Sequence, residues 1–170
     1  MSEQKNKAFM NLYQPAHARF EKFCKARVYG EFDFKDLMQE TILIAYQKFE
    51  TINEPKAFLY FLFGIAIRIL ANNNRKQKTE TLSMNSKMYQ IPNNFNLTDQ
   101  QIEINHLNTA LAMLPEVQRE SIILFEISGF SIKEIAELQN ASESAVKQRL
   151  LRGRQELLSI LEKKPMPITH

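Results

Sequence analysis

The chain has 170 residues and a formal net charge of only +3, so it has room for one domain or two small ones, and any nucleic-acid surface must come from local clustering of cations. The single cysteine, Cys24, excludes an internal disulfide framework and suits a reducing cytoplasm, where we expect the protein to act. Residues 57–71 are the most apolar stretch but are interrupted by Arg68, and the polar N-terminus lacks a signal-peptide core, so we expect no membrane span. Weak strand signals and scarce glycine predict an all-α fold.

The first helical pattern covers residues 8–27. Its apolar side chains recur at helical spacing, and Pro15 is expected to kink or divide the helix. Cys24 falls on the apolar side, so we expect it to be a small core residue. Tyr29 and Gly30 then break the helix.

A second amphipathic helix is predicted over residues 34–49, FKDLMQETILIAYQKF, with Asp33 or Asp36 as its N-cap. Asp36, Gln39 and Glu40 project away from its apolar side. Asp36 and Glu40 share a helix face, but no histidine lies nearby and nothing supplies the further ligands of a metal site. The pattern therefore favours a core helix with a polar outer face.

A third helix begins at Pro55, where the missing N–H of an early helical position does no harm. Its first part is apolar nearly all round, which predicts burial between other helices. Three asparagines and the basic residues Arg75 and Lys76 end it as a solvated, cationic segment.

Residues 79–101 show no sustained period and are rich in Asn, Ser, Thr and Gln, a composition that cannot bury enough apolar surface to fold alone. A segment of this length is unusual inside a compact domain and indicates a boundary. We therefore predict two small helical domains, residues 1–78 and 102–164, joined by a flexible linker and followed by a loose tail over residues 165–170.

The second predicted domain opens with an amphipathic helix over residues 102–114, followed by a helix that starts after Pro115 and ends at Gly129. Phe130 is expected to close the core beneath the next two helices. The apolar side of the helix over residues 102–114 is expected to carry Ile104, Leu107, Leu111 and Leu114.

The last two helices form the most informative pattern in the chain. Ser131 and Glu134 have the spacing of a capping box at the start of a short helix. Asn140 suits a tight left-handed turn, and Ser142 is placed to cap a longer basic helix. This arrangement is typical of a helix-turn-helix, in which the second helix enters the major groove of DNA. The alternative is an ordinary helical hairpin with a solvated basic face.

Residues 114–157, from LPEVQRESIILF through SIKEIAEL to AVKQRLLRGRQEL, resemble region 4 of bacterial RNA polymerase sigma factors of the extracytoplasmic-function (ECF) group. The string DLMQET of the second helix resembles the region 2 helix that grips the β′ coiled coil of the polymerase. The third helix resembles the segment that melts and reads the −10 promoter element. The resemblance implies a −35 contact and a β-flap contact for the second domain.

This resemblance, together with the chemistry of the side chains, gives four sets of candidate site residues. The polymerase-binding candidates are Asp36, Leu37, Gln39 and Glu40. The base-reading candidates are Ser142, Glu143, Ser144, Lys147 and Gln148. The phosphate-binding candidates are Arg149, Arg152 and Arg154, and the candidates at the −10 element are Arg68, Arg75 and Lys76.

Some positions depart from the family pattern. Ile67 and Arg68 stand where the family usually has Arg-Asn, Asn72 replaces an Asp, and Phe61 takes a position often occupied by Trp. These changes predict a relaxed −10 readout, with another DNA-bound protein as a candidate for bringing the factor to its sites. Gly153, where Ala is usual, is expected to weaken its helix by roughly 1 kcal/mol.

We therefore expect an ECF-type sigma factor that binds core RNA polymerase and promoter DNA, with an anti-sigma protein as a further candidate partner. The alternative is a stand-alone helix-turn-helix regulator, which would need no DLMQET helix. An enzyme is not expected, because the sequence lacks a phosphate-binding loop, a metal constellation and an activated nucleophile. We expect no cofactor.

Overall fold

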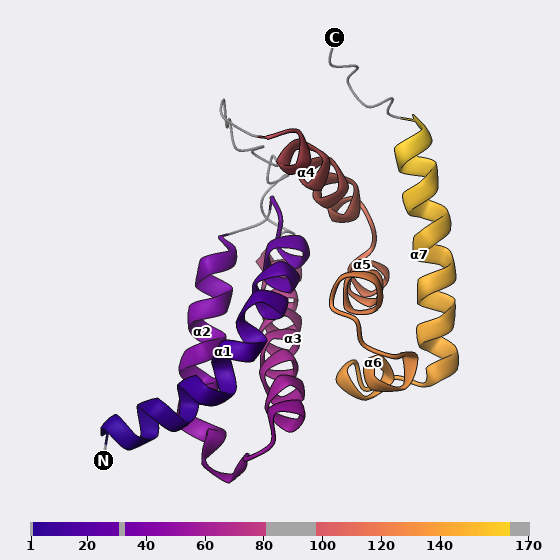
Figure 1. Cartoon of the computed structure of the whole chain (residues 1–170). Helices are drawn as coiled ribbons and strands as arrows, with labels where there is room; N and C mark the ends of the chain where they lie inside the picture. The colour runs from indigo at the N-terminus through magenta and orange to yellow at the C-terminus, as the bar shows by residue number, and fades with distance from the viewer. Residues whose placement is uncertain (1, 31–32, 81–97, 164–170) are drawn as a thin grey trace. The chain divides into compact units, whose positions relative to one another are not determined.

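A computed structural model of the chain describes residues 2–30, 33–80 and 98–163, and all regular secondary structure in these ranges is helical (Figure 1). The prediction of an all-α fold is confirmed. The chain divides into two compact units, residues 1–24 with 33–88 and residues 25–32 with 89–170. Most of the predicted linker, and the predicted loose tail, lie outside the described residues.

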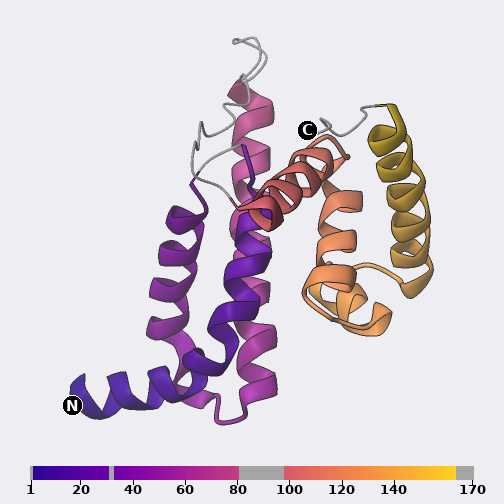
Figure 2. The same ribbon diagram turned by 45° about the horizontal axis from the view of Figure 1, so that its top comes forward.

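The first unit is built from α1 (Ser2–Arg27), α2 (Phe34–Lys48), a short 3-10 turn η1 (Phe49–Thr51) and α3 (Pro55–Glu80); the last turn of α1 belongs to the second unit. α1 starts six residues earlier than predicted. Lys5 explains part of this extension, because its ammonium lies 4.6 Å from the ring centre of Tyr46 in α2. α1 is bent in its course (Figure 2), and Pro15, which cannot donate a helical hydrogen bond, lies inside it.

Aromatic side chains form the core of the first unit. The Phe9 ring packs edge-on against Phe49 at 5.2 Å and Phe58 at 5.6 Å between centroids. The ring centre of Phe63 in α3 lies 5.5 Å from that of Phe20 and 5.0 Å from that of Phe23, both in α1. Edge-on aromatic pairs contribute roughly 0.5–1.5 kcal/mol each beyond area burial, so these rings fasten α1 to its two neighbours.

Cys24 belongs to this core. The thiol is fully buried, as predicted, and burial raises its pKa far above the ordinary value, with the Glu21 carboxylate adding to the effect. A thiol that stays protonated is a poor nucleophile. Cys24 is therefore a packing residue.

α3 differs from the sequence expectation in one respect. Among the described helices, its segment Pro55–Lys76 is long and apolar enough by length and composition to cross a membrane. Within the first unit, however, Phe58, Leu62 and Phe63 of this helix are fully buried. Packing in a protein core accounts for the same apolar composition.

The second unit contains α4 (Asp99–Ala112), α5 (Glu116–Ile122), a π turn η2 (Ile123–Ile127), α6 (Ile132–Leu138) and α7 (Glu143–Lys163). α4 starts before residue 102 because Thr98 and Gln101 form a capping box. The prediction that Ile104 and Leu107 share the buried side of this helix is wrong, since they are 49% and 38% exposed.

α5 and η2 form one continuous helical stretch with a wide turn in its second half. The Ser128 N–H donates to the Ile123 carbonyl oxygen, five residues back, at 2.8 Å. Gly129 ends the stretch with φ 80°, and Phe130, which was expected to be a core residue, is buried.

α7 packs closely on α5 at Gly153. A Cβ atom at this position would lie 2.5 Å from Cδ1 of Ile122, a distance that no side chain tolerates without a shift. Glycine therefore permits the close approach of the two helices, which the sequence showed only as a weak point in the helix.

Candidate nucleic-acid interface

The helix-turn-helix predicted from the sequence is present in α6 and α7. The Ser131 hydroxyl accepts from the Glu134 N–H at 3.1 Å, and the Glu134 carboxylate accepts from the Ser131 N–H at 2.9 Å. Asn140 has φ 52°, which makes the left-handed turn. The Ser142 hydroxyl accepts from the Ala145 N–H at 3.0 Å and caps α7. These local contacts fix the angle at which α7 leaves the turn.

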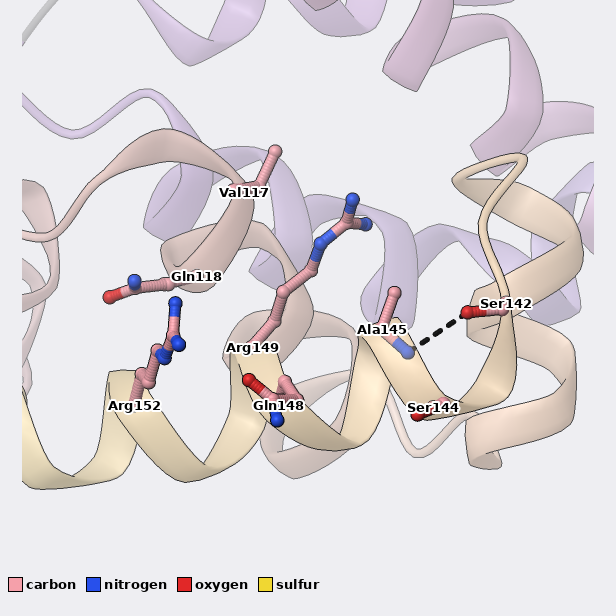
Figure 3. Close-up of a pocket in the computed structure, with 8 residues that line it drawn as sticks. All are labelled: Val117, Gln118, Ser142, Ser144, Ala145, Gln148, Arg149 and Arg152. Carbon is pink, nitrogen blue, oxygen red and sulfur yellow. Dashed lines mark hydrogen bonds between the residues drawn. The ribbon is translucent and has the colours of Figure 1, made fainter.

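A groove runs between the start of α5 and the first turns of α7 (Figure 3). Gln118 and Arg152 lie near each other at one end, and Ser142 and Ala145 lie at the other. Small polar groups and two guanidinium groups are suited to hydrogen bonding with phosphate oxygens and base edges. The groove is lined by Val117, Gln118, Ser142, Ser144, Ala145, Gln148, Arg149 and Arg152.

The groove brings together most of the predicted DNA-binding residues but not all of them. Glu143 and Lys147 are exposed on α7 without lining it. Arg154 is placed elsewhere: its Nη2 lies 2.8 Å from the Glu126 carboxylate, and its guanidinium carbon lies 5.4 Å from the Phe125 ring centre. Arg154 therefore has an intramolecular anion and an aromatic face as partners on the η2 side.

Leu151 was not singled out from the sequence, yet it is 57% exposed on α7. It lies one turn from Lys147 and Gln148 and next to Arg152, on the solvent side of the helix. An apolar side chain at such a place can contact the methyl group of thymine in the major groove. The sequence did carry a signal for Leu151, because this leucine interrupts the otherwise polar outer face of α7.

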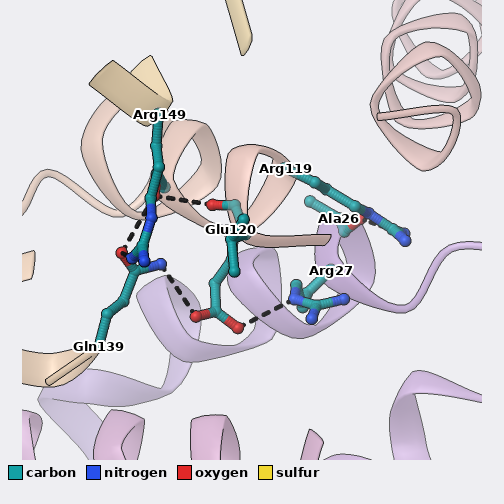
Figure 4. Close-up of polar contacts among 8 residues, drawn as sticks. Ala26, Arg27, Arg119, Glu120, Gln139 and Arg149 are labelled. Atoms are coloured by element: carbon teal, nitrogen blue, oxygen red, sulfur yellow. Dashed lines mark hydrogen bonds and ion pairs between the residues drawn. The ribbon is translucent and has the colours of Figure 1, made fainter. Parts of the chain in front are cut away.

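Arg149 is held by a partly buried polar network (Figure 4). Its Nη1 donates to Oε1 of Gln139 at 3.0 Å, and Nε2 of Gln139 donates to Oε1 of Glu120 at 3.0 Å. The other Glu120 oxygen accepts from Nε of Arg27 at 3.1 Å, with the two side chains 9% and 3% exposed. Arg27 lies in the segment 25–32, which belongs to the second unit together with Glu120.

Arg119 adds a second buried cation beside this network. It is 1% exposed, and its Nη2 donates to the Ala26 carbonyl oxygen at 3.0 Å. An arginine on the last carbonyls of a helix satisfies acceptors that would otherwise lack partners. Sequence reasoning assigned no role to Arg27, Arg119 or Glu120, since no local pattern marks them.

The polymerase-binding candidates divide into two groups on α2. Asp36, Gln39 and Glu40 are exposed, whereas Leu37 is 1% exposed and packs in the core. Leu43 was missed by the sequence reasoning and is 58% exposed. Positions 36, 40 and 43 recur at three- and four-residue spacing, so Leu43 shares the outer side of α2 with the two carboxylates.

The candidates on α3 lie on its open side. Arg68 is exposed, with its Nε 3.4 Å from the Gly64 carbonyl oxygen, and Arg75 and Lys76 are exposed further along. Phe61 is partly exposed, whereas Phe63 is fully buried and has no face for a base. Throughout the part of the chain that the structure describes, no three His, Cys, Asp or Glu side chains gather in a way that could hold a metal ion.

Two family models match the chain in succession. Residues 12–80 match sigma-70 region 2, and residues 105–157 match sigma-70 region 4. The first match contains α2 and α3, and the second contains the helix-turn-helix and its groove.

Curated relatives agree with these matches. The ECF RNA polymerase sigma factor EcfG of Rhodopseudomonas palustris is 27% identical over 74% of this chain and 70% of its own length. The ECF RNA polymerase sigma-E factor of Haemophilus influenzae is 25% identical over 80% of this chain and 76% of its own length.

Solved structures share the fold. The sigma factor RpoE of Bartonella quintana, in complex with the anti-sigma factor NepR, gives a TM-score of 0.69 at 22% identity over 90% of this chain and 98% of that chain. CnrH in complex with the cytosolic domain of CnrY gives 0.68 at 22% identity over 94% of this chain and 90% of that chain.

Proposed function

This chain belongs to the sigma-70 family, as an extracytoplasmic-function RNA polymerase sigma factor, and from this premise we propose how it directs promoter recognition and transcription initiation. The proposal divides the work between a polymerase-binding domain over residues 1–78 and a DNA-binding domain over residues 102–164, with residues 79–101 as a linker and 165–170 as a tail. The succession of a region 2 match and a region 4 match supports this division.

The second unit is proposed to bind the −35 element through α7. The groove in Figure 3 is the observation that carries this assignment, because it gathers Gln148, Arg149 and Arg152 beside the capped start of a helix. Gln148 offers both a donor and an acceptor to a base edge, and the two arginines suit phosphates. Leu151 adds an apolar contact for a thymine methyl group. Ser142, Glu143, Ser144, Lys147 and Arg154 complete the proposed contact set.

The first unit is proposed to bind the β′ coiled coil of the polymerase through the outer side of α2. Asp36, Gln39 and Glu40 supply the polar contacts, and the exposed Leu43 supplies an apolar one. Leu37 supports the interface from beneath, since its side chain is in the core.

The open side of α3 is proposed to face the −10 element, with Arg68, Arg75 and Lys76 near the DNA backbone. Phe61 offers a partly exposed ring for an unstacked base, an interaction worth roughly 1–3 kcal/mol. Because the chain departs from the family at positions 67, 68 and 72, we propose a relaxed −10 readout. Another DNA-targeting protein would then supply part of the site selection.

Further partners follow from the family and its structures. RpoE is found in complex with the anti-sigma factor NepR, and CnrH is found in complex with the cytosolic domain of CnrY. We propose that an anti-sigma protein also binds this chain. The β flap of the polymerase is proposed as a contact of the second unit. The chain itself is proposed to act in the cytoplasm and to carry out no catalysis, leaving RNA synthesis to the core enzyme.

The test is transcription by purified core RNA polymerase and this chain on a library of DNA templates. We expect transcripts from a subset of templates, and the double replacement of Asp36 and Glu40 by alanine should abolish both transcription and co-purification with the polymerase. Glu3→Ala, which removes an exposed carboxylate in α1, is the matched control. Binding to DNA without any binding to polymerase would instead support the stand-alone regulator, which the family and relatives do not favour.

A further inference from the structure

Glu120 lies at the centre of the network that holds Arg149, although it is buried behind the groove (Figure 4). The residue is 7% exposed, and both of its carboxylate oxygens accept hydrogen bonds, one from Gln139 and one from Arg27. An ionised carboxylate has no donor. Every group that faces Glu120 must therefore present an N–H or O–H to it.

This requirement fixes the orientation of the Gln139 side chain. A primary amide has one acceptor oxygen and one donor nitrogen, and only the nitrogen can face Glu120. The oxygen is then turned toward Nη1 of Arg149, at 3.0 Å, and toward the Ser121 hydroxyl, at 3.1 Å. A guanidinium group can only donate, so the Gln139 oxygen is the end of the amide that Arg149 requires.

We infer that Glu120 is a positioning residue for DNA binding: acting through Gln139, it directs the Arg149 guanidinium along the groove, where the rest of that group meets a backbone phosphate. A guanidinium has five N–H donors, so one bond to Gln139 sets its direction without exhausting them. The inference rests on the proposed binding of duplex DNA by this groove.

The isosteric change Glu120→Gln breaks the network by its hydrogen-bond polarity while it keeps the shape. If the oxygen of the new amide accepts from Arg27, its NH2 group faces Gln139. Gln139 then turns its own oxygen to that group and presents its NH2 group to Arg149. Two donors now face each other, and Arg149 is released from its position.

A swap of the two side chains restores every bond. In the double variant Glu120→Gln, Gln139→Glu, the new carboxylate accepts from Arg149, from Ser121 and from the amide at position 120. The amide oxygen at position 120 accepts from Arg27. The net charge of the swap equals that of the wild type, whereas Glu120→Gln alone is more positive by one charge. Charge alone would therefore strengthen DNA binding by the single variant, the opposite of the effect expected from the lost hydrogen-bond direction.

The experiment measures binding of the full chain to a labelled 30-base-pair duplex of random sequence as a function of salt. Each phosphate contact contributes about 0.9 to the slope of log affinity against log salt, so Glu120→Gln should weaken binding and shrink the affinity lost between 50 and 200 mM salt by about 3.5-fold. Arg149→Ala should do the same, and adding Glu120→Gln to it should change nothing more. The swap should restore the wild-type slope.

A Glu120→Gln variant with the wild-type slope, or a folded swap variant with the reduced slope, would overturn the inference. Circular dichroism checks that each variant is folded. If Glu120→Gln unfolds, the test becomes the salt dependence of DNA binding by the swap variant with and without Arg149→Ala. A wild-type chain that binds no duplex overturns the proposed function together with this inference. Wild-type binding that Arg149 and Glu120 do not influence overturns the inference only.

Discussion

Replacing Gly153 with alanine adds one methyl group where α7 meets α5, and a single neighbour decides the effect. The new Cβ would lie 2.5 Å from Cδ1 of Ile122 and 3.2 Å from its Cγ1. Alanine is favoured over glycine in a helix by roughly 1 kcal/mol, whereas overpacking a filled site costs about 1–3 kcal/mol. When the gain in helix propensity is subtracted from the cost of overpacking, Gly153→Ala should lower the free energy of unfolding of this unit by up to about 2 kcal/mol.

The Ile122→Val background removes the clashing Cδ1 atom, at its own cost of about 0.5–1.5 kcal/mol. In that background only the milder contact at 3.2 Å with Cγ1 of residue 122 remains to oppose the helix propensity, so Gly153→Ala should become less destabilising, and stabilising by at most about 1 kcal/mol. Native-state hydrogen exchange of the amides in α5 and α7 measures both differences. Gly64→Ala is the matched control, because a Cβ there would meet only Nη2 of Arg68 at 3.9 Å, and it should stabilise α3. Equal stabilisation by Gly153→Ala in both backgrounds would refute the close contact.

Three more predictions follow from burial and exposure. Arg27→Ala should leave the Glu120 carboxylate buried without its cation and cost about 3–5 kcal/mol of stability, measured by hydrogen exchange in α5; a loss below 1 kcal/mol would contradict a buried ion pair. Leu43→Ala should change stability by less than about 0.5 kcal/mol but weaken binding of core polymerase, measured by a binding titration, and unchanged affinity would remove Leu43 from the interface. Cys24 should react with a disulfide reagent at pH 8 only after urea is added, because burial raises its pKa and suppresses the thiolate; rapid labelling of the native chain would contradict this.

Signals carried by neighbouring residues could be predicted from the sequence. The capping box of Ser131 and Glu134, the left-handed Asn140 and the cap at Ser142 each depend on side chains within four positions of one another. The helix-turn-helix was therefore recognisable before its packing was known. The early start of α1 was not, because the contact between Lys5 and Tyr46 joins two separate helices.

The choice of helix face was harder to predict. On α2, the family resemblance placed Leu37 among the polymerase-binding candidates, although helical spacing put it on the apolar side; the structure buries Leu37 and leaves Leu43 exposed. On α7, Arg152 lines the groove while Arg154, two residues on, lies near Glu126 on the η2 side. A step of two residues turns a helix by more than half a circle, so similar residues in one basic run have different surroundings.

The buried network could not be predicted, because its members come from distant parts of the chain. Arg27 and Glu120 are separated by 93 positions, and Gln139 and Arg149 by 10. Arg149 was recognised from the helix-turn-helix pattern, but no pattern of fixed spacing marks Arg27, Glu120 or Gln139 as its supports. Only the folded chain brings their donors and acceptors together, and the inference about Glu120 depends on that arrangement.

The wide turn at Ile123–Ile127 has a consequence for how this protein tolerates changes in length. A regular helix advances by about 100° per residue, so the extra residue held in a π turn rotates everything after it by about that angle. Gly129 and both helices of the DNA-reading motif come after it. Deleting one residue here would leave a regular α-helix but would rotate the helix-turn-helix relative to the preceding helix. A substitution at the same place would leave that orientation unchanged.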